Sequence, residues 1–206
     1  ISLKSYNQFK LEKIKLSKIK KIFLEDAQYY IEDVRKKVIE SFTYDKVYKQ
    51  GFNINTPINL EFQKIATKTL RDGLISYDKR KGWRGALTNK KYSKKWINDL
   101  EKFKLEKSLN WELAIVKKLN KFSAEIETKK GLNGKIEFQD ISWTKKEFTN
   151  LLKVGDIIYV KNINKNIYSL KQLPKINGGM VVMDPYTGRV LALSGGFSFK
   201  KSEFNR

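Results

Sequence analysis

The sequence contains no cysteine and no histidine among its 206 residues. Structural zinc is usually held by Cys and His, and thiol nucleophiles or Ser-His-Asp triads need one of these two residues. All of these sites are therefore excluded. Because proteins without cysteine occur in reducing and oxidising compartments alike, this absence does not locate the protein.

Long apolar runs and acidic residues are also scarce. No stretch of about 18 apolar residues occurs, so we expect any membrane anchor to precede Ile1, and we find no signal peptide. Lys and Arg number 43 against 22 Asp and Glu, which gives a net charge of +21. Only 6 of the 43 are arginine, the residue that phosphate-binding proteins often use. We interpret the charge as a solvated basic surface, with a functional anionic partner as the alternative.

The first half of the chain has helical periodicity. Residues 2–22 mix basic and apolar positions irregularly, which favours a linker with helical tendency over a membrane-surface helix. Apolar residues recur every four positions from Ala27 to Phe42, and Asn59 is a suitable N-cap for a second helix that runs to about Asp78. Gly73 in this helix is expected to allow close packing. The predicted buried stripe of the second helix is Leu60, Ile65, Ala66, Leu70, Leu74 and Tyr77.

Two shorter elements are predicted around this second helix. Residues 51–57 alternate like a short strand that ends at Pro57, and residues 92–107 predict a short amphipathic helix.

From Trp111 the period changes from helical to alternating. Five short strands are predicted, separated by turns that contain Gly131, Gly134 and Gly155, with a helical turn at 144–152 between the third and fourth. This order is typical of a five-stranded OB-like barrel, which we assign to residues 111–174. The predicted strands cover residues 113–116, 123–128, 135–138, 156–160 and 168–173.

The C-terminal residues 180–183 and 190–193 form two apolar runs around a turn that contains Pro185 and Gly188. They should pair as antiparallel strands. Both runs are apolar at nearly every position, which predicts burial on both faces. Because too little chain follows these runs to cover both faces of such a sheet, we expect the sequence to be a piece of a longer protein.

Three motifs resemble class A penicillin-binding proteins of the 1A type, which are bifunctional peptidoglycan synthases. They are the run Gly178-Gly179-Met180-Val181-Val182-Met183-Asp184-Pro185-Tyr186-Thr187-Gly188-Arg189, the loop Gly82-Trp83-Arg84-Gly85, and Val154-Gly155-Asp156. The resemblance implies an α+β chain with linker helices at 1–50 after a glycosyltransferase domain. It further implies a transpeptidase-base strand and helix at 51–110, the OB-like insert at 111–174 and the first transpeptidase hairpin at 175–206.

The resemblance also implies what this region does. Both active sites of the family would lie outside it, so we predict a non-catalytic region that positions them, with no catalytic, cofactor-binding or metal-binding residue. Peptidoglycan or its lipid-linked precursor would be bound through the rest of the protein. A regulatory protein would dock on the OB-like domain, at the periplasmic face of the bacterial inner membrane.

Ser-x-x-Lys, the nucleophile motif of this family, occurs four times. Chance alone predicts about two such pairs in a sequence with this much serine and lysine, so the motif carries little information. None of them is predicted to be catalytic. The pairs are Ser17/Lys20, Ser76/Lys79, Ser142/Lys145 and Ser198/Lys201.

A module that binds single-stranded nucleic acid is the alternative function. OB barrels bind bases by stacking them on aromatic side chains in a basic groove. Because many of these aromatic side chains must fill the barrel, we consider nucleic acid the less favoured partner. The candidates are Trp111, Phe122, Phe138, Trp143 and Tyr159, with Lys117, Lys118, Lys121 and Lys135 nearby.

Overall fold

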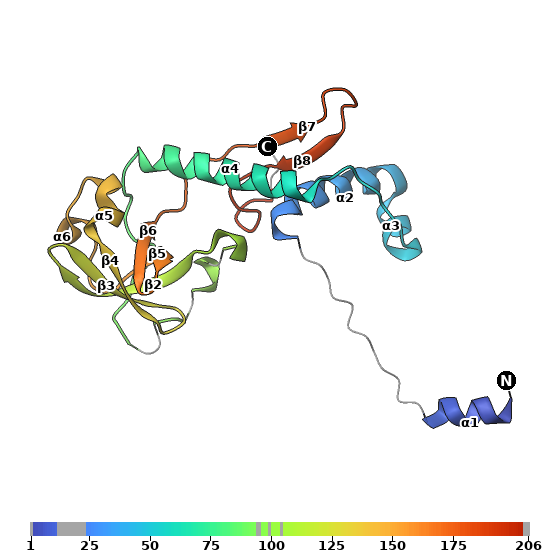
Figure 1. The fold of residues 1–206 in the computed structure, drawn as a ribbon, viewed down its shortest axis with the longest axis horizontal. Helices are drawn as coiled ribbons and strands as arrows, with labels where there is room; N and C mark the ends of the chain where they lie inside the picture. Colours follow the sequence, from blue (N-terminus) through green and yellow to red (C-terminus); the bar gives the residue numbers. More distant parts are fainter. Residues whose placement is uncertain (1, 12–23, 94–95, 99, 104, 204–206) are drawn as a thin grey trace.

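The computed structural model describes residues 2–11, 24–93, 96–98, 100–103 and 105–203 (Figure 1). Its helices are α1 (Leu3–Leu11), η1 (Glu25–Ala27), α2 (Gln28–Phe42), α3 (Tyr44–Gln50), α4 (Leu60–Lys79), η2 (Glu101–Phe103), η3 (Lys107–Leu109), α5 (Phe138–Ile141), η4 (Ser142–Thr144) and α6 (Phe148–Leu151), where η marks a 3-10 helix. Its strands are β1 (Thr88–Asn89), β2 (Glu112–Asn120), β3 (Ser123–Thr128), β4 (Asn133–Glu137), β5 (Asp156–Asn164), β6 (Ile167–Lys171), β7 (Met180–Met183) and β8 (Val190–Ser194).

Strands β2 to β6 form the predicted five-stranded barrel, with the order β5-β2-β3-β4-β6 closed by pairing of β5 with β6. The β4–β6 pair is parallel and the other pairs are antiparallel. Alternate residues point inward, so that Ala114, Ile126, Ile136 and Leu170 are completely buried. The α+β class and the OB-like barrel are thus confirmed. The short strand β1 extends the sheet beyond the predicted strands by pairing with β5.

Helix α4 confirms the helix predicted from Asn59, whose side chain accepts hydrogen bonds from the backbone N–H groups of Glu61 and Phe62. Its predicted apolar stripe is partly wrong. Ala66, Leu70 and Leu74 are buried, whereas three other members of the stripe, Leu60, Ile65 and Tyr77, are exposed.

Gly73 has no non-local neighbour within 4 Å of an added Cβ, so the expected close packing is wrong.

The hairpin β7–β8 lies beside α4 and α2 (Figure 1). Only one face of the hairpin is covered: Ala192 and Ser194 are buried, whereas Val181 and Met183 on the opposite face are more than half exposed. The second face that was predicted to be buried is thus left uncovered by the part of this chain that the structure describes.

The predicted strand at 51–57 is absent, since residues 52–59 are irregular. The edge of β8 beside this segment is occupied by other groups. Asn59 donates its backbone N–H to the carbonyl of Leu191, and the side chain of Gln63 takes the next position at Leu193. These groups leave no room for a further strand at this edge of β8.

The predicted helix at 92–107 is also wrong: its described residues contain the single 3-10 turn η2, and η3 begins at Lys107. Trp96 and Leu100 are buried against the outer face of β2 and β5. Backbone carbonyls of this segment accept hydrogen bonds from distant side chains. The carbonyl of Phe103 accepts from the hydroxyl of Tyr159 at 2.6 Å, and the carbonyl of Lys102 accepts from the ammonium of Lys201. These tertiary contacts replace helical hydrogen bonds.

Among the described helices, none has the length and the apolar character needed to cross a bilayer.

Candidate functional site: a polar junction around α4

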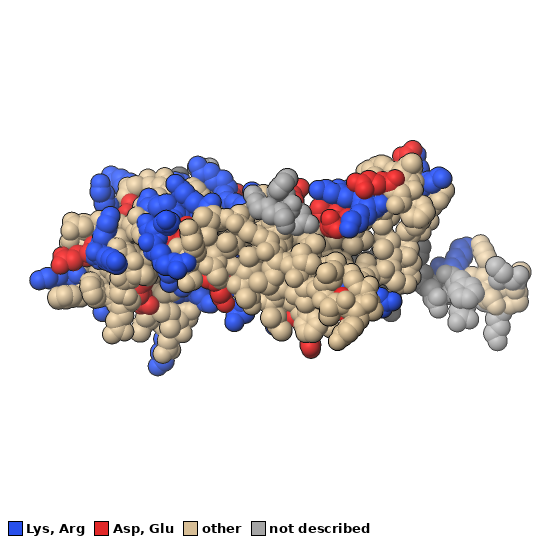
Figure 2. Space-filling model, turned by 90° about the horizontal axis from the view of Figure 1, so that it is seen from above, with Lys and Arg blue, Asp and Glu red and all other residues tan. Residues whose placement is uncertain are grey.

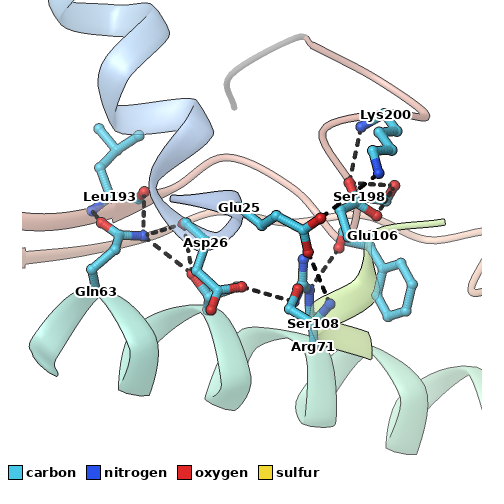
Figure 3. Close-up of polar contacts among 11 residues, drawn as sticks. Glu25, Asp26, Gln63, Arg71, Glu106, Ser108, Leu193, Ser198 and Lys200 are labelled. Carbon is cyan, nitrogen blue, oxygen red and sulfur yellow. Dashed lines mark hydrogen bonds and ion pairs between the residues drawn. The ribbon is translucent and has the colours of Figure 1, made fainter. Parts of the chain in front are cut away.

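Helix α4 carries buried polar side chains on the face that meets the hairpin (Figure 3). Gln63 is only 1% exposed. Its amide donates to the carbonyl of Leu193 at 3.0 Å and accepts from the N–H of Leu193 at 2.9 Å, as a neighbouring strand would. The same amide nitrogen donates to the carbonyl of Asp26 at 2.8 Å. One side chain thus closes the edge of β8 and fixes the start of α2.

One and two turns further along α4, Thr67 and Arg71 continue this contact. The Thr67 hydroxyl donates to the carbonyl of Asp26 at 3.2 Å. The Arg71 guanidinium donates to the carbonyl of Phe197, to the carboxylate of Asp26 and to the hydroxyl of Ser108 at 3.0, 3.2 and 3.0 Å. Arg71 therefore joins η1, the segment before the barrel and the segment after the hairpin.

A buried carboxylate links the last two of these segments directly. Glu106 is 2% exposed, and its two oxygens accept the hydroxyl of Ser198 at 2.9 and 2.8 Å. Glu106 also accepts the backbone N–H of Lys200 at 2.9 Å, and Glu25 accepts the N–H of Ser108 at 2.9 Å (Figure 3). A buried carboxylate must be hydrogen-bonded to be tolerated, so this cluster fixes the position of both loops.

The other end of α4 binds the entry and exit of the barrel. The buried carboxylate of Asp78 accepts hydrogen bonds from Arg84, from Gln172 and from the backbone N–H of Lys175 at 2.8 to 3.1 Å. A second nitrogen of Arg84 forms an ion-pair contact with it at 2.8 Å. Burial raises the pKa of Asp78, but the hydrogen bonds from Arg84 and Gln172 outweigh it and hold the pKa below its ordinary value. Arg84 also donates to the carbonyl of Leu173 at 2.7 Å.

Trp83, in the same Gly-Trp-Arg-Gly loop, turns toward the barrel. Its indole N–H donates to the carbonyl of Leu151 at 3.2 Å, and its ring meets the edge of Trp143 at 6.1 Å between centroids. The aromatic side chain packs against the core of the barrel while the guanidinium beside it binds α4. This loop is therefore a two-sided connector between α4 and the barrel.

Comparisons with known proteins agree with this architecture. Residues 83–176 match the model of the penicillin-binding protein OB-like domain. The chain is 36% identical over 185 residues to penicillin-binding protein 1A of Rickettsia bellii, and 26% identical over 195 residues to that of Pseudomonas aeruginosa. These matches cover 87% and 88% of this chain and 23% of each relative. The crystal structure of penicillin-binding protein 1A from Haemophilus influenzae matches with a TM-score of 0.76 at 28% identity, over 100% of this chain and 30% of that one.

The chain belongs to the class A penicillin-binding proteins. It spans 23% of the length of the curated relatives named here. The matched OB-like region begins at residue 83 and so includes β1 and the Gly-Trp-Arg-Gly loop, which lie before the 111–174 range assigned from the strands.

The Ser-x-x-Lys pairs do not form nucleophile sites in the part of this penicillin-binding protein that the structure describes. Ser198 is 2% exposed and bonds to Glu106, while the ammonium of Lys201 donates to the carbonyl of Lys102. The hydroxyl of Ser142 donates to a backbone carbonyl, and Lys79 lies over the ring of Trp143 and not on Ser76. The pair Ser17/Lys20 lies outside the described residues.

The aromatic candidates for base stacking are divided between different places. Tyr159 is buried, and Trp111 packs between Tyr159 and Phe197. Trp143 is half-buried beside Trp83, as described above. Phe122 and Phe138 are exposed, at 66% and 45%. Of the lysines near them, Lys117 is paired with Glu127 at 3.2 Å and Lys135 with Glu137 at 3.7 Å, whereas Lys121 lies over the Phe122 ring and Lys118 is exposed.

Sequence reasoning missed the polar face of α4. Gln63, Thr67 and Arg71 follow one another at intervals of four, and Asp78 follows seven residues later. This spacing places them near one line of a helix, so it is a signal that could have been found. It was overlooked because a buried helical face is expected to be apolar.

Proposed function

We propose that this chain is the central, non-catalytic region of a peptidoglycan synthase that carries glycosyltransferase and transpeptidase activities elsewhere in its length. In this role it would lie at the periplasmic face of the bacterial inner membrane and bind peptidoglycan or its lipid-linked precursor through the rest of the protein. The supports are the family membership and the 23% of the relatives' length that the chain spans. Its task is to hold the OB-like barrel and the hairpin in one geometry.

The observation that carries this proposal is the placement of four buried polar groups along α4. Gln63 and Arg71 bind the hairpin and the segment after it, and Asp78 binds the entry and exit of the barrel. Hydrogen bonds of this kind are directional, so they fix orientation where an apolar contact would permit sliding. Helix α4 therefore holds two modules, the OB-like barrel and the β7–β8 hairpin, at a fixed distance and orientation.

The relative position of the barrel and the hairpin can be tested by double electron–electron resonance spectroscopy, which measures the distance between two spin labels. The chain has no native cysteine, so labels attached after Lys118→Cys on β2 and Tyr186→Cys in the hairpin turn are unique. Both native side chains are exposed, and labelling them disturbs no described core. We expect a narrow distance distribution, because one rigid helix connects the two modules.

The proposal predicts that Arg71→Met and Arg84→Met each broaden this distribution while the far-ultraviolet circular dichroism is retained. Arg35→Met is the matched control, because Arg35 pairs with Glu32 in α2 and interacts with Tyr48 in α3, and none of its described bonds reaches the barrel or the hairpin. A distribution that is already broad without these substitutions, or that broadens equally in the control, would refute a positioning role.

We further propose that the barrel offers a docking surface to a regulatory protein. Phe122 and Phe138 flank the paired residues Ser123 and Glu137, so they lie at the same end of the β3–β4 pair, and both are exposed. A photo-crosslinking amino acid at 122 or 138 should form an adduct in cells that a matched position on α3, Lys46, does not. Adducts from neither barrel position would contradict the proposal.

A further inference from the structure

Besides Lys64 and Lys68 on α4, three lysines from three separate elements line one groove between α4 and the barrel. They are Lys79 at the end of α4, Lys161 on β5 and Lys171 on β6. The groove has a volume of about 540 Å³ and continues into a second hollow of about 580 Å³ that the same three lysines line. Figure 2 shows Lys and Arg side chains gathered over the barrel half of one face.

The strand register brings two of these lysines together. Tyr159 lies opposite Lys171, and Lys161 lies opposite Ser169, in the antiparallel pair of β5 and β6. Lys161 and Lys171 are therefore diagonal neighbours on the same face, where like charges disfavour each other. Repulsion between two such lysines lowers the stability of the fold, and a bound anion would offset it.

No described carboxylate forms an ion pair with Lys79, Lys161 or Lys171, and Lys79 is instead over the ring of Trp143 at 5.5 Å. Two acidic residues that line the groove lie closest to other basic side chains. Asp26 binds Arg71, and Asp72 lies 3.8 Å from Lys68. Asp140 attracts Lys79 and Lys171 without an ion-pair contact, so the three ammonium groups have no directly bound counter-ion among the described carboxylates.

The protonation of two groups at the groove agrees with this arrangement. Burial, followed by the charges of Lys79 and Lys161, lowers the pKa of Lys171 to about 8, against the opposing influence of Asp140 and Asp72. Burial also raises the pKa of Asp140, against the opposing influence of the charges of Lys171 and Lys79. An anion that entered the groove would relieve the repulsion felt by Lys171.

The groove is not suited to stacking bases. Its two aromatic side chains, Trp111 and Trp143, are already packed against other rings, and one face of Trp143 is covered by Lys79. Arg71 also lines the groove, but its guanidinium is used by Phe197, Asp26 and Ser108. Recognition by charge without stacking fits a small anion better than single-stranded nucleic acid.

We propose that the groove lined by Lys79, Lys161 and Lys171 is a binding site for a small, multiply charged phosphate ligand of the diphosphate class. Three ammonium groups that line the same hollow can donate to separate phosphate oxygens, and a diphosphate carries several negative charges to offset theirs. The ligand can be free in solution or be the head group of a lipid. This inference does not rest on the positioning role proposed above.

The test is calorimetric titration of the 206-residue chain with inorganic pyrophosphate at constant ionic strength set by sodium chloride. We expect a single binding site, and we expect the double variant Lys161→Gln/Lys171→Gln to weaken binding on the order of 10-fold or more. The matched control, Lys118→Gln/Lys121→Gln, removes the same charge from the β2–β3 end of the barrel and should change the affinity by less than about twofold. Without ligand, we expect the first variant to melt no lower than the unmodified chain, because repulsion is removed.

Three results would overturn the proposal. The first is no pyrophosphate binding by the unmodified chain, and the second is equal weakening in the control, which would indicate nonspecific attraction. The third is an oligonucleotide that binds through the same lysines and is not displaced by pyrophosphate. Sedimentation with phosphatidylcholine vesicles that contain diacylglycerol diphosphate, a lipid with a diphosphate head group, separates the sources. Binding to these vesicles that needs Lys161 and Lys171 indicates a lipid head group, and pyrophosphate binding alone indicates a free ligand.

Discussion

Replacing Arg84 by methionine should destabilise the contact between α4 and the barrel more than its position in an exposed loop suggests. The side chain of Asp78 is 4% exposed and that of Arg84 is 23% exposed, and a hydrogen bond at 2.9 Å and an ion-pair contact at 2.8 Å join them. Methionine keeps the length and the apolar part of the side chain but removes the charge. The carboxylate of Asp78 would then be buried without a cation.

The expected cost follows from what remains around Asp78. Removing one member of a buried ion pair costs about 3–5 kcal/mol, because the remaining charge is uncompensated. Gln172 and the N–H of Lys175 still donate to Asp78, which places the loss near the lower limit. The lost hydrogen bond to the carbonyl of Leu173 adds about 1 kcal/mol. We therefore expect a decrease of about 3–4 kcal/mol in the free energy of unfolding.

Urea denaturation followed by tryptophan fluorescence measures this change, since Trp83 lies beside Arg84 in the sequence and contacts the barrel. The double variant Asp78→Asn/Arg84→Met should lose less than Arg84→Met alone, because no charge is left buried. Arg35→Met removes a partly exposed pair within α2 and a contact with Tyr48 of α3, so it should shift the midpoint by much less than Arg84→Met does. A loss below about 1 kcal/mol for Arg84→Met would refute the reasoning, because it would mean that Asp78 is adequately solvated.

Three further predictions concern the same framework. Gly73→Ala should raise the unfolding free energy by about 0.5–1 kcal/mol in urea denaturation, because an added Cβ meets no non-local atom within 4 Å, and a loss would contradict this. Gly155→Ala should destabilise the barrel by more than about 1 kcal/mol in the same assay, since φ is +89° and the Cβ would lie 2.4 Å from the carbonyl oxygen of Lys90. Below pH 4 the chain should lose stability as Asp78 is protonated. The pKa of Asp78 is lower in the folded state than in the unfolded state, so the ionised carboxylate stabilises the fold fully above the unfolded-state pKa, and this stabilisation is lost as the pH falls through the folded-state pKa. Asp78→Asn should flatten the acid limb of a pH titration of the melting temperature, and an unchanged limb would be evidence against it.

The elements that local pattern determines could be predicted from the sequence. The five barrel strands have alternating apolar residues and Gly-bearing turns, and α4 has an N-cap at Asn59, so their positions follow from side-chain spacing. The segment 92–107 shows the limit. Its apolar residues at helical spacing are equally suited to cover the outer face of β2 and β5, and bonds such as Tyr159 to the carbonyl of Phe103 decide in favour of the latter.

The junction was harder to predict, because its partners are far apart in the sequence. Gln63 meets Leu193, and Glu106 meets Ser198. No local pattern connects such residues, and each one read alone is typical of an exposed polar position. The Gly-Trp-Arg-Gly loop drew attention through its composition, but the role of Arg84 depends on Asp78 and Gln172, which only the folded chain brings to it.

The two ends of α4 have different tasks, and their separation explains why both are needed. The barrel is joined to the rest of the chain by an entry segment and an exit segment that meet near Asp78. A single attachment there would leave the barrel free to rotate about that point. Arg71 supplies a second attachment through Ser108, immediately before β2, and lies seven residues earlier in α4, or about 10 Å along the helix. Two attachments at this separation resist rotation that either one alone would allow, so a variant at Arg71 should change barrel orientation even when the Asp78 contact is intact.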